Sequence, residues 1–180
     1  MKVRSLRDRY AEQLRSLYDA EQQLIKALPR MAKAASSEEL RSALEDHLAK
    51  TRDHAQRIED IFQRMGRKPG GRKCGAMESL VNEGSVAMEK SVGGAAKDAA
   101  VTAAARRVEQ YEIAGYGCVL AHATVLGDDS AAASLAQTLK EEEDADKVLS
   151  GIAKRPHLEA SREQIDSEGR KVKNRSMSLA

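Results

Sequence analysis

Residues 95–126 read AAKDAAVTAAARRVEQYEIAGYGCVLAHATVL. Apolar residues recur in this stretch three or four positions apart, which predicts one long α-helix that buries a single face. The predicted inward positions are Val101, Ala105, Val108, Tyr116 and Val119. Glu109 and Glu112 fall on the same face. Carboxylates on the buried face of so long a helix predict a helical bundle with a polar site inside it.

Segments on both sides of this helix show the same spacing. Long helices are predicted over residues 4–35, 36–65 and 130–153. A long connection opens with the breaker cluster GRKPGG at residues 66–71 and carries a short helix over 74–91. Two long helices, a long connection and two more helices are typical of an all-α four-helix bundle whose halves are joined by a crossover. Residues 1–153 are therefore predicted to form the bundle, and 154–180 a polar, disordered tail.

Composition excludes several classes of protein. Charged residues make up 32% of the 180 residues, but the net charge is only +2, which argues against a dedicated nucleic-acid binder. No apolar run approaches the roughly 20 residues that a membrane span needs. We therefore expect a cytoplasmic protein without a membrane partner. Cys74 and Cys118 stand in no metal-binding pattern, and both are expected to be buried free thiols.

Polar residues are also trapped on the apolar faces of the other three helices. Glu21 lies midway along the face of the first helix. The second helix carries three such residues and the fourth carries two: His47, Thr51, His54, Glu142 and Asp146. Glu141 and Glu143 are expected to point toward solvent. Every helix thus contributes polar groups near its middle, and the four glutamates are expected to lie at one depth.

Buried carboxylates need compensation, because removing a charge from water costs several kcal/mol even after relaxation. Metal cations, protonation, or arginine and histidine partners can supply it. Tyr18, Tyr111 and Tyr116 are candidates for simple hydrogen bonds instead. Carboxylates with one or two imidazoles suit iron, or after it manganese, as a di-metal site. The predicted metal ligands are Glu21, His54, Glu109, Glu112 and Glu142, with His47 and Asp146 as further candidates.

Four stretches carry a resemblance to a known family. They are YDAEQQLIKALPRMAKAA (18–35), RKCGAMESLVNEG (72–84), RRVEQYEIAGYG (106–117) and LKEEEDADKVL (139–149). Over residues 4–153 the chain resembles the YciF/YciE-like family of bacterial ferritin-like stress proteins. The resemblance implies a ferritin-like four-helix fold, a homodimer, and a buried site similar to that of rubrerythrin, whose Glu-x-x-Glu matches Glu109-x-x-Glu112.

The chain departs from the wider ferritin pattern at two positions. Thr51 stands where Glu-x-x-His would place a bridging glutamate, and Ala145 stands where a histidine is expected. Three hypotheses follow. The chain is a stress-associated protein that binds iron, an oxidoreductase that acts on peroxide or dioxygen at the same site, or a metal-free dimeric interaction module. No catalytic residue is assigned.

Overall fold

The structure, a computed structural model, describes residues 5–91 and 93–177 and consists of five helices joined by short connections. They are α1 (Leu6–Ala34), α2 (Glu38–Arg64), α3 (Gly75–Lys90), α4 (Gly94–Val125) and α5 (Asp129–Met177). The all-α prediction is confirmed within the described residues. The predicted bounds of the first four helices differ from these by about two residues at most.

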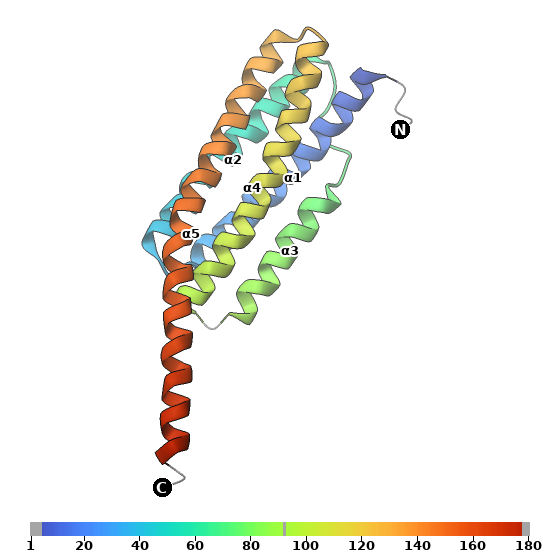
Figure 1. The fold of residues 1–180 in the computed structure, drawn as a ribbon. Coiled ribbons are helices and arrows are strands. Elements are labelled where there is room, and N and C mark those ends of the chain that lie inside the picture. Colours follow the sequence, from blue (N-terminus) through green and yellow to red (C-terminus); the bar gives the residue numbers. More distant parts are fainter. Residues whose placement is uncertain (1–4, 92, 178–180) are drawn as a thin grey trace.

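Four of the helices form a bundle in which every neighbouring pair is antiparallel (Figure 1). The helix α1 packs against α2 and α4, and α5 packs against the same two helices. The helices α2 and α4 are therefore diagonal, and they run in the same direction. The chain must return along the bundle between them, and α3 makes that return on the outside of α1 and α4. This is the crossover that the long connection predicts.

Polar contacts attach the crossover and the turns to the bundle. The Asp19 carboxylate accepts a hydrogen bond from the backbone amide of Cys74 at 2.7 Å, where α3 begins. Asp98, buried near the start of α4, accepts the backbone amides of Ser36 and Ser37 at 2.6 and 2.8 Å. The turn between α1 and α2 is thereby held by the other half of the chain.

The core consists of two apolar clusters. One contains Leu24 of α1, Leu44 of α2 and Val108 of α4. The other contains Leu14 of α1 and Ile58 of α2. On α2, α4 and α5, buried polar positions separate the residues of the two clusters along the helix, and on α1 the buried Glu21 lies next to their boundary. A polar layer therefore crosses the middle of the bundle, at the depth that the helical spacing predicts.

The helix α5 corrects one prediction. An end near Ala153 and a disordered tail were expected, but the helix continues to Met177 and projects beyond the bundle (Figure 1). Pro156 lacks a backbone donor and its ring crowds the carbonyl one turn earlier, but no glycine follows it until Gly169, and helix-forming residues after it continue the helix. Residues 178–180 lie outside the described residues. Among the described helices, none combines the length and the apolarity of a membrane span.

Candidate metal centre

Six titratable side chains fill the polar layer. Each of them is at most 5% exposed to solvent. They come from all four helices of the bundle: Glu21 from α1, His47 and His54 from α2, Glu109 and Glu112 from α4, and Glu142 from α5. The side chains predicted to lie at one depth are thus brought together.

Four of these residues form a first group. Ligand atoms of His47, Glu109, Glu112 and Glu142 all lie within 4.8 Å of one another. The Nε2 atom of His47 is 3.2 Å from Oε1 of Glu109 and 3.8 Å from Oε2 of Glu142. An imidazole and three carboxylates at such separations could hold one metal ion.

A second group shares one residue with the first. Ligand atoms of Glu21, His54 and Glu142 also lie within 4.8 Å of one another. The Nδ1 atom of His54 is 2.9 Å from Oε1 of Glu142 and 3.7 Å from Oε1 of Glu21. Glu142 belongs to both groups: its Oε2 lies near His47 and its Oε1 near His54, so this carboxylate could contribute to either.

The second nitrogen of His54 has a carboxylate partner of its own. Nε2 lies 2.9 Å from Oε2 of Glu141. The guanidinium of Arg57 donates to both oxygens of Glu141, at 2.6 and 3.1 Å, which fixes that carboxylate in place. In the neutral ring, this pairing would keep the proton on Nε2 and leave Nδ1, which lies beside the acidic cluster, as the nitrogen that could bind a metal. Glu141 is more exposed than Glu142, as expected, but its carboxylate still contacts His54, which the sequence did not predict.

Two neutral residues complete the layer. The Tyr116 hydroxyl donates a hydrogen bond to Oε1 of Glu21. Tyr116 is one of the three tyrosines that the sequence suggested as hydrogen-bond partners of the buried carboxylates. Thr51 is buried, and its hydroxyl donates to the backbone oxygen of His47 at 3.0 Å, within its own helix. Thr51 therefore offers no bridging carboxylate. The imidazole of His47, one turn earlier, lies near Glu109 and Glu142 instead.

The layer has too little positive charge for its carboxylates. Burial, reinforced by Glu142, raises the pKa of Glu21 to about 8 despite the opposing effects of His54 and Tyr116. Burial and the neighbouring glutamates raise the pKa of Glu109 and Glu112 well above the ordinary value. These shifts express first the burial of the carboxylates and then the repulsion among them.

The histidines and the shared glutamate respond in different ways. Burial lowers the pKa of His47, which favours the neutral imidazole that metals bind. Burial also acts to lower the pKa of His54, but its contacts with Glu142, Glu21 and Glu141 outweigh burial and raise it. Burial acts to raise the pKa of Glu142, whereas its contacts with His54 and His47 lower it. Glu142 is therefore the carboxylate most readily ionised within the layer.

Several acceptor atoms in the layer have no hydrogen-bond donor. Both side-chain oxygens of Glu112 and of Glu142 are buried without one, as is one oxygen each of Glu21 and Glu109. A buried polar atom that lacks a partner costs roughly 1–3 kcal/mol. Oxygens that face one another in this way fit a cation in both position and chemistry.

One further candidate ligand does not join the centre. Asp146 is only partly buried, and its Oδ1 accepts from Nε of Arg106 on α4 at 2.9 Å. This ion pair at the α4–α5 contact turns Asp146 away from the layer and corrects the prediction that it faces inward. Of the two cysteines, Cys74 is buried as expected, but Cys118 is exposed.

A small cavity of about 90 Å³ reaches the centre between α2 and α5. His47 forms part of its wall, together with Ala145, Val148 and the side chains of Asp46 and Lys50. Ala145 is the position at which the ferritin pattern has a histidine. A methyl group there leaves space that an imidazole would fill.

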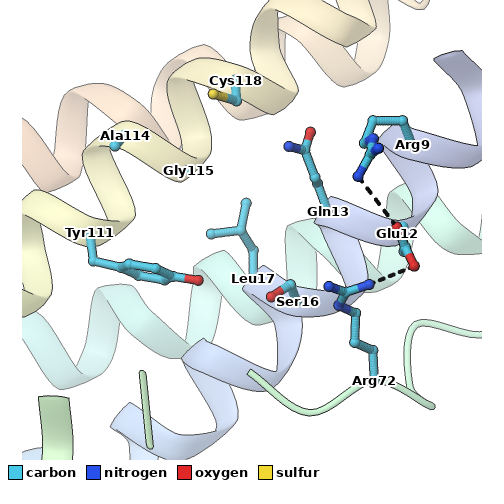
Figure 2. A pocket seen from close by; sticks show the side chains of 10 residues that line it. All are labelled: Arg9, Glu12, Gln13, Ser16, Leu17, Arg72, Tyr111, Ala114, Gly115 and Cys118. Atoms are coloured by element: carbon cyan, nitrogen blue, oxygen red, sulfur yellow. Dashed lines mark ion pairs between the residues drawn. The ribbon is translucent and has the colours of Figure 1, made fainter. Parts of the chain in front are cut away.

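A second cavity, of about 370 Å³, lies between α1 and α4 (Figure 2). On one side, Glu12 accepts ion pairs from Arg72 at 2.6 Å and from Arg9 at 3.8 Å. On the other side lie Leu17 and the ring of Tyr111. The six residues of the polar layer do not line this cavity. No motif in the sequence indicates this cavity, because its lining residues come from α1, α4 and the connection before α3.

Comparisons with known proteins agree with this architecture. The chain matches the family described as "Domain of unknown function (DUF892)" over residues 5–164. Protein YciF of Escherichia coli (strain K12) is 37% identical over 154 residues, which are 85% of this chain and 93% of that protein. The crystal structure of the E. coli stress protein YciF matches with a TM-score of 0.83 at 36% identity, over 87% of this chain and 99% of that one.

A more distant match shows the fold alone. An Anabaena variabilis protein with a DJ-1/ThiJ/PfpI-like and a ferritin-like domain matches with a TM-score of 0.62 at 18% identity. The match covers 86% of this chain and 38% of that one. The bundle is thus ferritin-like, and the chain belongs to the DUF892 family, in the YciF-like group of ferritin-like proteins.

Proposed function

We propose that this chain is a stress-associated protein that binds iron as a two-metal centre in the middle of its bundle. The ligands are Glu21, His54, Glu109, Glu112 and Glu142, with His47 as a second imidazole. One observation carries the proposal: buried carboxylate oxygens without hydrogen-bond donors face each other in two groups that share Glu142. The association with stress rests on the name of the E. coli relative.

The donor set supports iron over other metals. Carboxylate oxygens combined with imidazole nitrogens suit iron or manganese, whereas sites rich in thiolate suit zinc. Cys74 and Cys118 belong to neither group of candidate ligands. Bound cations would neutralise the carboxylates whose pKa burial raises, and Glu141 would hold His54 in the tautomer that presents Nδ1. Bound iron(II) would supply electrons to an oxidant that reaches it.

Metal titration tests this proposal. Metal-free protein, prepared with a chelator, is titrated anaerobically with iron(II), and the bound metal is measured by elemental analysis after gel filtration. Two ions per chain are expected for the wild type. Glu142→Gln is expected to abolish binding of both ions, while Glu143→Gln, an exposed neighbour on the same helix, should bind like the wild type. Wild-type protein that retains no metal would refute the proposal.

The small cavity at His47 favours a second candidate function, reduction of peroxide or dioxygen at the same centre. The cavity has a volume of about 90 Å³, which is enough for peroxide or dioxygen but too small for a larger organic substrate. Rapid mixing of the iron(II)-loaded protein with hydrogen peroxide should oxidise two iron(II) ions per molecule of peroxide. Loaded protein that oxidises no faster than free iron(II) would leave metal binding without an oxidoreductase activity.

The family resemblance also supports a homodimer. Sedimentation of the full chain across a tenfold range of concentration tests this directly. A dimer that persists in the presence of a chelator would show that assembly does not depend on the metal centre.

A further inference from the structure

A cavity of about 240 Å³ lies at the end of the bundle where α1 and α5 begin and α2 and α4 end, the upper end in Figure 1. Its polar lining consists of Arg7 and Tyr10 from α1, Arg64 from the end of α2, and Asp128 and Ser130 from the start of α5. It shares no lining residue with the polar layer. The cavity is therefore a feature independent of the proposed metal centre.

Tyr10 is the unusual member of this lining. Its side chain is 1% exposed, yet its hydroxyl has no hydrogen-bond partner among residues 5–91 and 93–177. Burial, reinforced by Asp128, raises the pKa of Tyr10 to about 12 against the opposing effect of Arg64, so the phenol keeps its proton at neutral pH. A buried hydroxyl that retains its proton and lacks an acceptor is a donor available to a ligand in the cavity.

Two exposed arginines, Arg7 and Arg64, line the same cavity. In the described part of the chain, neither Arg7 nor Arg64 forms an ion pair or a hydrogen bond. Other arginines of the molecule, such as Arg57 and Arg72, are paired with carboxylates. Guanidinium groups match the oxygens of phosphate in geometry as well as in charge. Two of them at one cavity therefore favour a phosphate group as the ligand.

The start of α5 adds a further attraction for anions. Ser130 is the second residue of α5, and the first turn of a helix presents free backbone amides and a partial positive charge. Asp128 supplies the opposing negative charge. Its Oδ1 accepts from the backbone amide of Ala131 at 3.0 Å, so part of this carboxylate is used as a helix cap. The lining thus carries two guanidinium groups and one carboxylate, so its net charge is positive.

We propose that this cavity binds a phosphate group, held by the Tyr10 hydroxyl and by the guanidiniums of Arg7 and Arg64. The cavity volume accommodates phosphate with a small organic substituent, so the ligand is inorganic phosphate or a phosphomonoester of a small molecule. The site does not depend on the proposed metal function.

Thermal unfolding of the full chain tests this inference. All measurements are made in the presence of a chelator, which keeps the metal centre in one state. Inorganic phosphate at ten times its Kd is expected to raise the Tm by about 3–5 °C over sodium chloride of matched ionic strength. The same measurement is repeated with glycerol 3-phosphate in place of inorganic phosphate. A larger shift with this ester assigns the site to a phosphomonoester, and an equal or smaller shift assigns it to free phosphate.

Three variants connect the shift to the cavity. Tyr10→Phe and Arg64→Gln should each lose most of the phosphate-dependent shift, whereas Arg52→Gln, an exposed arginine elsewhere on α2, should keep it. Without phosphate, Tyr10→Phe should unfold at or above the wild-type temperature, because it removes a hydroxyl that has no partner. The inference is overturned if phosphate acts no more strongly than chloride, or if it shifts the wild type and Tyr10→Phe equally. A large loss of stability in phosphate-free Tyr10→Phe would also overturn it.

Discussion

Replacing Glu112 with glutamine separates the two roles that a buried carboxylate can have. Glu112 is fully buried, and neither of its oxygens has a hydrogen-bond donor. Burial, with Glu21 and Glu142 as the next causes, raises its pKa and favours the protonated form in the metal-free protein. Glutamine has nearly the same shape as a protonated glutamate. Glu112→Gln should therefore change the unfolding free energy of the metal-free protein by less than about 1 kcal/mol.

The metal-bound protein should respond in the opposite way. At a metal concentration of 100 times Kd, binding stabilises the wild type by about 2.7 kcal/mol. Loss of one oxygen ligand that weakens binding by about 10- to 100-fold removes about 1 to 2 kcal/mol of this stabilisation. For a chain of this length the metal-induced rise in Tm should then shrink by about 3–8 °C.

Differential scanning calorimetry with and without iron(II), under anaerobic conditions, measures both quantities. Glu143→Gln is the matched control, because it makes the same chemical change at an exposed position of α5. The reasoning fails if iron raises the Tm of Glu112→Gln as much as that of the wild type. It also fails if the metal-free variant unfolds several degrees below the wild type, since Glu112 would then be supporting the core.

Three further substitutions test other parts of the structure. Because the pKa of Glu21 is raised from 4.5 to about 8 in the folded protein, this group should cost the metal-free protein little stability below pH 4.5 and several kcal/mol once the pH has risen to about 8. Glu21→Gln should flatten this dependence in urea unfolding curves. Asp98→Ala should cost about 2–4 kcal/mol in the same assay, because two backbone amides lose a charged acceptor. Gly115→Ala should cost about 1–3 kcal/mol, because the added methyl group would lie 2.7 Å from Cδ2 of Leu17. Gly117→Ala is its control, since no atom lies within 4 Å of the added methyl group; it should stabilise the helix by about 0.5–1 kcal/mol.

The fold was predictable because helical periodicity repeats over many residues. The apolar faces fixed both the number of long helices and the depth of the polar residues, since position along a helix follows directly from sequence number. The end of α5 was not predictable in the same way. Pro156 is a local signal for a helix end, and the helix formers after it outweighed that signal.

The details of the candidate site depended on helix rotation, which one sequence does not specify. Glu141 and Glu143 lie on either side of Glu142, and nothing in their sequence context distinguishes them. Contact with His54 and Arg57 of α2 brings only Glu141 into the site. Asp146 is drawn toward Arg106 by a contact between α4 and α5 that is likewise invisible before the helices are packed.

The position of Glu142 in both groups of candidate ligands makes the two halves of the centre interdependent. Loss of Glu21 or of Glu109 would impair one ion most, whereas loss of Glu142 would impair both. An ion bound in one half would also fix the orientation of the carboxylate that the other half shares. Occupancy of the centre should therefore depart from that of two independent sites, with the first ion setting the affinity for the second.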